Sequence, residues 1–253
     1  MIIEKQHIAL LQYLVKGDIK AKYKSKMLGA LWAVIDPLVL MLIYILLIKF
    51  IFQRGGEYYA AELLVGLVSY RWFSLTSMNA SKVLVSNRKM LHTVRIPISV
   101  LPLSRVLINS VDFMVGFVLI LALLFFFGLY PSVYWLWLPV LFALQFAFIY
   151  ALAVIFAIIG VYFRDLTNVL QFGVRILLYG SPILYSISQI PDEFQLLYRF
   201  GSPLSTLIES YKNVLIFKTN PDAYFWVFGL YVIGLWSLAV YLQRSNKNLT
   251  KDL

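Results

Sequence analysis

Long apolar segments follow one another along almost the whole chain, and they decide what this sequence can fold into. A helix that crosses the hydrocarbon core of a bilayer needs about 20 mostly apolar residues. The segments of this length are 31–52, 61–83, 98–127, 134–163, 169–187 and 224–242. The composition agrees, because 61% of the 253 residues are hydrophobic and 13% are charged. We therefore predict an all-α membrane protein with six transmembrane helices.

The fifth apolar segment differs from the others because it contains residues that interrupt helices. Arg175 lies inside it, and the consecutive residues Gly180, Ser181 and Pro182 begin five positions later. Irregular backbone at membrane depth is tolerated where it is buried in protein or lines a cavity. The sequence is therefore compatible with a broken or re-entrant fifth span.

The distribution of Lys and Arg predicts how the chain is oriented. The formal net charge is +10. With the N-terminus inside the cell, most basic residues outside the spans fall in cytoplasmic segments, which is the usual bias. We therefore expect both termini to be cytoplasmic. Because these residues flank apolar runs, they suit anionic lipid headgroups, and nucleic-acid binding is not expected.

The first 30 residues have a pattern of their own. Apolar residues recur at helical spacing, and lysines occupy a neighbouring face. The apolar positions are Ile8, Leu11, Val15, Ile19 and Tyr23, and the lysines are Lys16, Lys20 and Lys24. This pattern predicts an amphipathic helix at the membrane interface, and the alternative is a disordered basic tail.

No catalytic, cofactor or metal site is expected from the sequence. There is no G-x-x-x-x-G-K-[ST] loop and no Gly-Lys pair, so the chain cannot hold nucleotide phosphates in the P-loop manner. Any ATP would be hydrolysed by another subunit. The two histidines, His7 and His92, have no acidic or cysteine neighbour at ligand spacing.

A polar stripe is predicted on the third span. Arg105, Asn109 and Asp112 lie at i, i+4 and i+7, so the first and last point only about 20° apart on a helix. Ionisable groups within spans usually face a bundle interior or a wet cavity. The alternative is that the stripe joins helices through hydrogen bonds.

Aromatic residues beside polar positions form a second group of candidates. They are Tyr44, Tyr70, Trp72, Phe73, Tyr179 and Tyr185, with Arg71 inside the second-span cluster. Aromatic faces suit stacking on sugar rings, and the tips of Tyr and Trp can form hydrogen bonds. We predict that these residues line a translocation channel, and the alternative is ordinary packing.

Two short segments outside the span centres carry further predictions. The connector between the second and third spans mixes basic and apolar residues, which favours a short helix that docks on a soluble partner. At the start of the first span, Asp36 can cap the helix and Pro37 is tolerated in its first turn. Asp36-Pro37 would then mark a joint between the lysine-rich helix and the span, or a simple helix start.

Four runs of the sequence carry a family resemblance. They are GDIKAKYKSKMLGALWAVIDPLVLMLIY, NRKMLHTVRIPISVLP, GVYFRDLTNVLQFGVRILLYGSPILYSISQIP and SPLSTLIESYKNVL. Together they resemble the ABC-2 type permeases, and most of all the branch that exports O-antigen, capsule or teichoic acid chains. Ser202-Pro203 and Tyr211-Lys212 stand where that branch often has Asn-Pro and Tyr-Arg, which affects the substrate more than the family.

The resemblance implies a homodimer in the bacterial cytoplasmic membrane, bound to two separate ATPase subunits that hold the ATP. A lipid-linked polysaccharide would pass between the two permeases. The implied division of the single domain 1–253 is an interface helix 1–30, five spans in 31–187, a coupling region 84–97, an extracytoplasmic gate 188–222, a last span 223–243 and a cytoplasmic tail 244–253. The coupling residues are then Asn87, Arg88, Lys89, Met90, Leu91, His92 and Val94.

The leading interpretation is therefore the permease subunit of an ATP-driven polysaccharide exporter. One alternative is an ABC-2 exporter of drugs or other small hydrophobic molecules. A membrane-embedded transferase is a further alternative. It is less favoured because Asp36, Asp112 and Asp165 are scattered over different spans.

Overall fold

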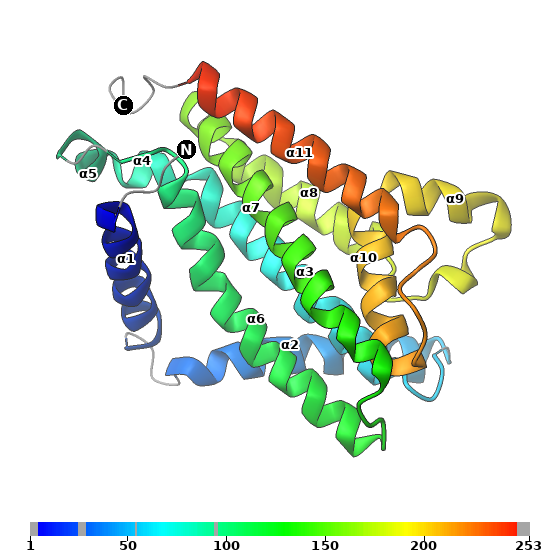
Figure 1. The fold of residues 1–253 in the computed structure, drawn as a ribbon. Helices are drawn as coiled ribbons and strands as arrows, with labels where there is room; N and C mark the ends of the chain where they lie inside the picture. The colour runs from blue at the N-terminus through cyan, green and yellow to red at the C-terminus, as the bar shows by residue number, and fades with distance from the viewer. Residues whose placement is uncertain (1–4, 25–28, 54, 94–95, 247–253) are drawn as a thin grey trace.

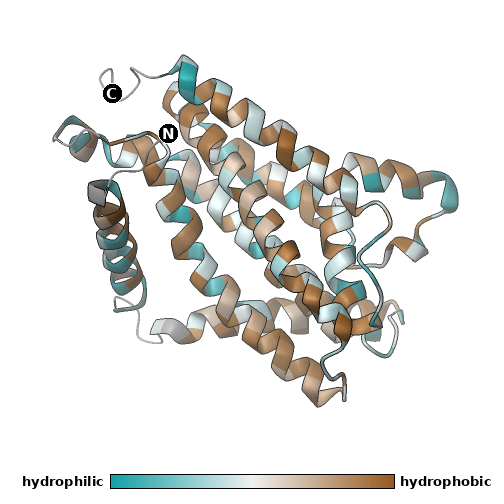
Figure 2. Ribbon diagram, in the orientation of Figure 1, coloured by the Kyte–Doolittle hydropathy of each residue, from teal (hydrophilic) through white to brown (hydrophobic). Residues whose placement is uncertain are grey.

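The computed structural model describes residues 5–24, 29–53, 55–93 and 96–246. Within these residues the chain is a bundle of helices and contains no β-strand (Figure 1). The predicted all-α class is confirmed. Figure 2 shows hydrophobic residues along all the long helices, whereas hydrophilic residues gather on α1, on α5 and at the ends of the bundle.

The helices have the following bounds. In chain order they are α1 (Lys5–Lys24), η1 (Gly29–Leu31), α2 (Trp32–Ile45), η2 (Leu46–Ile51), α3 (Tyr59–Ser81), α4 (Val83–Ser86), α5 (Arg88–Thr93), α6 (Val100–Phe126), η3 (Val133–Trp137), α7 (Leu138–Tyr162), α8 (Leu166–Gly180), η4 (Ile187–Gln189), α9 (Asp192–Gly201), α10 (Pro203–Lys212), η5 (Asn213–Phe217) and α11 (Phe225–Ser245). The elements η2 and η5 are π-helical, and η1, η3 and η4 are 3-10 helices.

Four helical segments of the described chain are long and apolar enough to cross a membrane. They are Trp32–Ile51, Val100–Phe126, Val133–Tyr162 and Phe225–Ser245. The chain is therefore a multi-pass membrane protein. The other two predicted spans have a different form, because α3 is rich in polar residues and α8 has only 15 residues. The six-span topology stays a prediction.

Helix α3 forms the centre of the bundle. It packs against α2, α6, α7, α8 and α10, and Leu63, Leu64 and Val65 on three successive positions are fully buried. A helix that is buried on all sides needs no apolar stripe. This explains how α3 can carry many Ser and Thr residues and still belong to the core.

Glycines on neighbouring helices allow close contact with α3. Gly116 of α6 lies against Val68, and Gly160 of α7 lies against the backbone of Ser81. A Cβ atom at Gly160 would be 1.7 Å from the Ser81 carbonyl oxygen. Small residues at such crossings let helix backbones approach within the membrane.

The fifth apolar segment is broken, as its sequence suggested. Helix α8 ends at Gly180, and Ser181 adopts extended backbone angles (φ −107°, ψ 155°). The following Pro182 explains this, because the residue before a proline is restricted to extended conformations. After the break come η4 and two short helices, α9 and α10.

The N-terminal segment is helical, as predicted, and forms α1, whereas its position at the membrane interface stays a prediction. It packs against α6 and runs in a different direction from the long helices of the bundle (Figure 1). Lys16, Lys20 and Lys24 are exposed. Leu10 and Leu14 contact an apolar cluster formed by α4, α5, α6 and α7.

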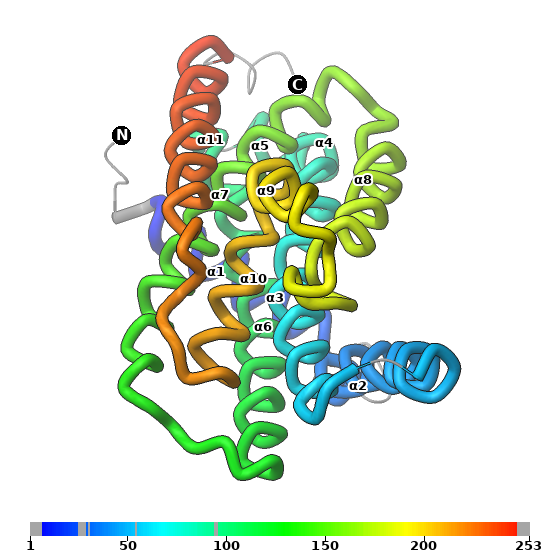
Figure 3. Tube along the Cα trace, turned by 90° about the vertical axis from the view of Figure 1, so that its right-hand side faces the viewer, coloured from blue at the N-terminus to red at the C-terminus, as the bar shows by residue number. Residues whose placement is uncertain are grey.

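The two ends of the bundle differ in composition. Figures 1 and 3 place α4, α5 and the end of α11 together at one end, and the connection between α6 and α7 at the other. Figure 3 also shows α2 and α8 on the same side of the molecule, with α8 above α2 in that view. The short connector helices and the C-terminal end of α11 therefore share one end of the bundle.

We expect Gly160→Ala to destabilise the protein, because the added methyl group cannot fit beside Ser81. Overpacking of this kind typically costs about 1–3 kcal/mol. Thermal unfolding in detergent measures the loss. Gly173→Ala on α8 is the matched control, since no atom lies within 4 Å of a Cβ there. Equal unfolding temperatures for the two variants would contradict the packing described.

Candidate functional site

Helix α1 is tied to α6 by ion pairs. Asp18 Oδ2 lies 2.9 Å from Arg105 Nη1, and Lys22 Nζ pairs with Asp112 Oδ2. Tyr23 OH donates a hydrogen bond to Asp112 Oδ1 (2.6 Å). Burial and this hydrogen bond raise the pKa of Tyr23 above its usual value, so the phenol remains a donor.

These contacts explain two residues of the predicted polar stripe. Arg105 and Asp112 lie on one face of α6, as their spacing required, and both find partners on α1. The third residue, Asn109, donates to Thr76 Oγ1 of α3 (3.2 Å). The stripe therefore joins α6 to two other helices, which agrees with the interhelical alternative.

Asp36 has a different role from the one its sequence context suggested. Helix α2 begins at Trp32 and has no side-chain cap, so Asp36 and Pro37 lie inside the helix. The predicted cap and joint at this pair is wrong. Arg71 Nη2 donates to Asp36 Oδ2 (2.5 Å), because a cation in a span requires a counter-charge. The turn between α1 and α2 comes earlier, where Gly29 adopts a φ of 46°.

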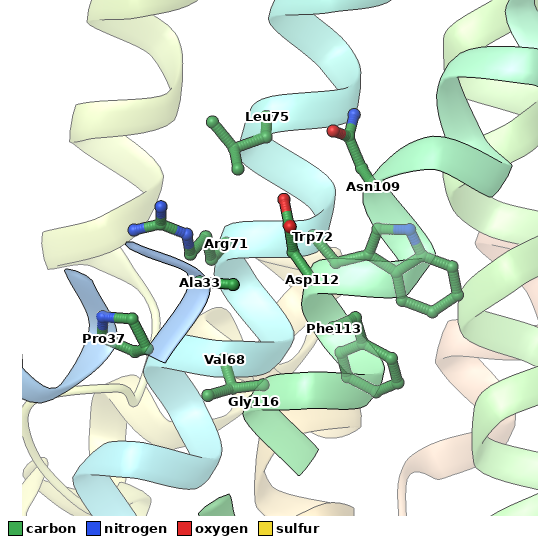
Figure 4. A pocket seen from close by; sticks show the side chains of 10 residues that line it. All are labelled: Ala33, Pro37, Val68, Arg71, Trp72, Leu75, Asn109, Asp112, Phe113 and Gly116. Carbon is green, nitrogen blue, oxygen red and sulfur yellow. The ribbon is translucent and has the colours of Figure 1, made fainter. Parts of the chain in front are cut away.

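A cavity of about 180 Å³ lies between α1, α2, α3 and α6. Its lining is Lys22, Tyr23, Gly29, Trp32, Ala33, Asp36, Arg71, Leu75, Asn79, Asn109 and Asp112. A smaller hollow of about 10 Å³ shares Arg71, Asn109 and Asp112 with it and reaches the rings of Trp72 and Phe113. Figure 4 shows the side chains of this hollow converging between α2, α3 and α6.

The cavity brings together residues that were predicted separately. Arg71 was a channel candidate, Asp112 belonged to the stripe, and Asp36 to the start of the first span. Lys22 and Asn79 were not predicted, because nothing in their local sequence distinguishes them from surface residues. Among the residues that line the cavity, Arg71 has a buried Nε without a hydrogen-bond partner.

Two of the channel candidates lie inside the core of the chain. Trp72 and Phe73 are 3% and 4% exposed. Trp72 stacks on Phe113 with ring centroids 4.6 Å apart, and its Nε1 donates to the Val106 carbonyl (3.3 Å). In this conformation neither ring faces an open surface.

The tyrosine candidates lie at or near an open groove. The groove, of about 160 Å³, runs between α2, α3 and α8, and Tyr44, Tyr70 and Arg71 line it. Tyr70 OH donates to the Val174 carbonyl of α8. Tyr179 is 59% exposed. Tyr185 OH donates a hydrogen bond to the Tyr179 carbonyl oxygen (3.1 Å). The role of these residues in a channel stays a prediction.

The connector contains the short helix that the sequence predicted, α5, but its apolar side faces the chain itself. Leu91 is 5% exposed and belongs to the same cluster as Val83 and Leu84 of α4. The expectation that Leu91 offers a docking face is therefore wrong, because its side chain is already buried. Val94 lies outside the described residues.

The exposed surface of the connector is basic. Arg88, Lys89 and His92 are exposed, and Met90 is half-buried. The Asn87 amide donates to the Val83 carbonyl (2.8 Å) and so supports the turn between α4 and α5. A partner that docks here would meet positive charge, beside the exposed side chain of Val85.

A second polar cluster lies at the opposite end of the bundle and was missed by the sequence analysis. Lys212 is 1% exposed, and its Nζ donates to the carbonyls of Pro182 (2.7 Å) and Tyr185 (3.1 Å). It lies 3.8 Å from Glu62 Oε2, which accepts a hydrogen bond from Ser186 (2.9 Å). These contacts fix the broken segment after α8.

Comparison with known proteins gives consistent results. The family model of the ABC-2 type transporters matches residues 9–216. Two Klebsiella pneumoniae proteins, each named O-antigen export system permease protein RfbA, are 30% identical over 239 residues, which cover 94% of this chain and 91% of the relative. A Myxococcus xanthus protein of the same name is 29% identical over 251 residues, with coverage of 98% and 96%. The family match includes every residue that lines the cavity.

The two groups of aromatic residues are expected to respond differently to truncation. Phe73→Ala should lower the free energy of unfolding by about 3–5 kcal/mol, as for other buried aromatic residues. Tyr179→Ala should leave stability nearly unchanged because its ring is exposed. Thermal unfolding of both purified variants measures this. A normal unfolding temperature for Phe73→Ala would show that its ring is not part of the core.

Proposed function

Because the chain belongs to the ABC-2 type transporter family, we propose that it is the membrane subunit of an ATP-driven polysaccharide exporter. Its cargo is a lipid-linked glycan of the O-antigen type, which it moves across the bacterial cytoplasmic membrane. The observation that carries the proposal is the similarity to O-antigen export permeases over nearly the full length of both chains.

The ATP is bound and hydrolysed by a separate subunit. The chain has no phosphate-binding loop, so energy must come from a partner. The basic surface of α5 is the docking site for that partner. In support, this surface lies at the same end of the bundle as the C-terminal end of α11, with its basic Arg244. Basic residues mark the cytoplasmic side.

The conduit forms between two copies of the chain. A polar polymer needs a continuous wet lining across the bilayer, and a single copy has an open groove between α2, α3 and α8. Tyr44 and Tyr70 give this groove aromatic surfaces. A second copy that faces the groove closes it into a channel.

A deletion strain tests the function and the docking surface together. Without the gene, surface polysaccharide should be lost while glycan synthesis continues, and the wild-type chain should restore it. The Arg88→Glu, Lys89→Glu double variant should neither restore export nor co-purify with the ATPase, because the charge of the docking surface is reversed. Immunoblots of surface glycan and affinity co-purification are the measurements.

The matched control is Lys218→Glu, which changes an exposed lysine beyond η5. It should restore export and bind the ATPase like the wild type. Surface glycan that is unaffected by the deletion would contradict the proposed function. Normal co-purification of the double variant would instead contradict the docking surface alone.

A further inference from the structure

The cavity between α1, α2, α3 and α6 has no net charge. Each of its two cations is paired with a carboxylate: Lys22 with Asp112, and Arg71 with Asp36. A free anion would be repelled by the carboxylates, and a free cation by the lysine and arginine. The ligand that suits this lining is neutral and polar.

The lining also matches the hydrogen-bonding needs of hydroxyl groups. A hydroxyl both donates and accepts, and the cavity offers carboxylate acceptors, guanidinium donors and the amides of Asn79 and Asn109, which do both. Arg71 Nε is an unpaired buried donor at this cavity.

An aromatic ring completes the lining. Trp32 is 39% exposed and lines the cavity where η1 leads into α2. An indole offers a flat apolar face, which fits the C–H face of a sugar ring. Planar polar side chains on one side and an aromatic ring on another are suited to a pyranose.

The volume fits one small unit. At about 180 Å³, the cavity far exceeds the ~10–15 Å³ that a single water needs, and it is close to the roughly 150 Å³ that holds one benzene ring. It is smaller than the ~300–1,000 Å³ of pockets for larger ligands. One six-membered ring therefore fits, and an oligosaccharide does not.

From this lining and volume we propose that the cavity is a carbohydrate-binding site for a single neutral pyranose unit. The inference rests on the proposed function, because the glycan cargo supplies such units. A ring bound there contacts α1 together with the three helices of the bundle. The site thus connects the presence of cargo to the position of the amphipathic helix.

Saturation-transfer NMR on the full-length chain in lipid nanodiscs tests the site directly. The probes are methyl pyranosides of glucose, galactose, mannose and N-acetylglucosamine. At least one should receive saturation from the wild type. Asn79→Leu fills the cavity and removes an amide, so affinity should fall about tenfold, as for the loss of one or two polar contacts. Asn79→Ala, which keeps the space, should also bind more weakly.

Asn168→Leu is the control, because Asn168 is exposed on α8, and it should bind like the wild type. Thermal unfolding of each sample shows that the variants are folded. No saturation of any pyranoside by the folded wild type would mean that the cavity holds only water, and equal binding by Asn79→Leu would mean that the sugar binds elsewhere; either result overturns the proposed site. If the wild type also restores surface glycan in the deletion strain, only the site is refuted. If it does not, the proposed function fails.

Discussion

Charged side chains that lie among apolar helices need opposite charges close by, and this requirement decides how the N-terminal half is arranged. Removing a charge from water costs several kcal/mol unless a partner compensates. Arg71 on the central helix is paired with Asp36 on α2, and Asp112 on α6 is paired with Lys22 on α1. The N-terminal helix α1 is therefore held against the bundle by ion pairs.

The same physical rule applies at the other end of the bundle. Lys212 is almost completely buried, and the carbonyls of the broken segment and the Glu62 carboxylate surround it. Arg199 of α9 pairs with Asp222 and lies over the ring of Tyr224, 4.9 Å from its centroid. Two separate clusters of charged side chains thus stabilise the packing of the bundle. The proposed path for the cargo runs along the face between them.

Local sequence patterns predicted those features that depend only on neighbouring residues, such as helix breaks and the faces of single helices. The break after α8 follows from Gly180 and Pro182, and the helical spacing of Arg105 and Asp112 placed both on one face. Sequence could not supply the partners of these residues, since Asp112 and Lys22 are 90 positions apart. Such contacts depend on how helices pack, which no short pattern encodes.

The wrong predictions have equally local causes. Asp36-Pro37 resembles a helix start, yet the apolar residues before it extend α2 back to Trp32. Leu91 was interpreted as a docking residue because it is an apolar residue in a basic connector, and a six-residue helix is too short for its periodicity to show which side faces the bundle. In both cases the tertiary structure assigned the residue a partner inside the chain.

The central claim is that the ion pairs between α1 and α6 couple the amphipathic helix to the transport bundle. The most direct measurement is the amount of surface glycan in strains that carry Asp18→Arg, Arg105→Asp or both changes, because this pair is the more exposed of the two. The account predicts reduced export from each single variant and recovery in the double variant. Normal export from both single variants, or no recovery in the double, would contradict it.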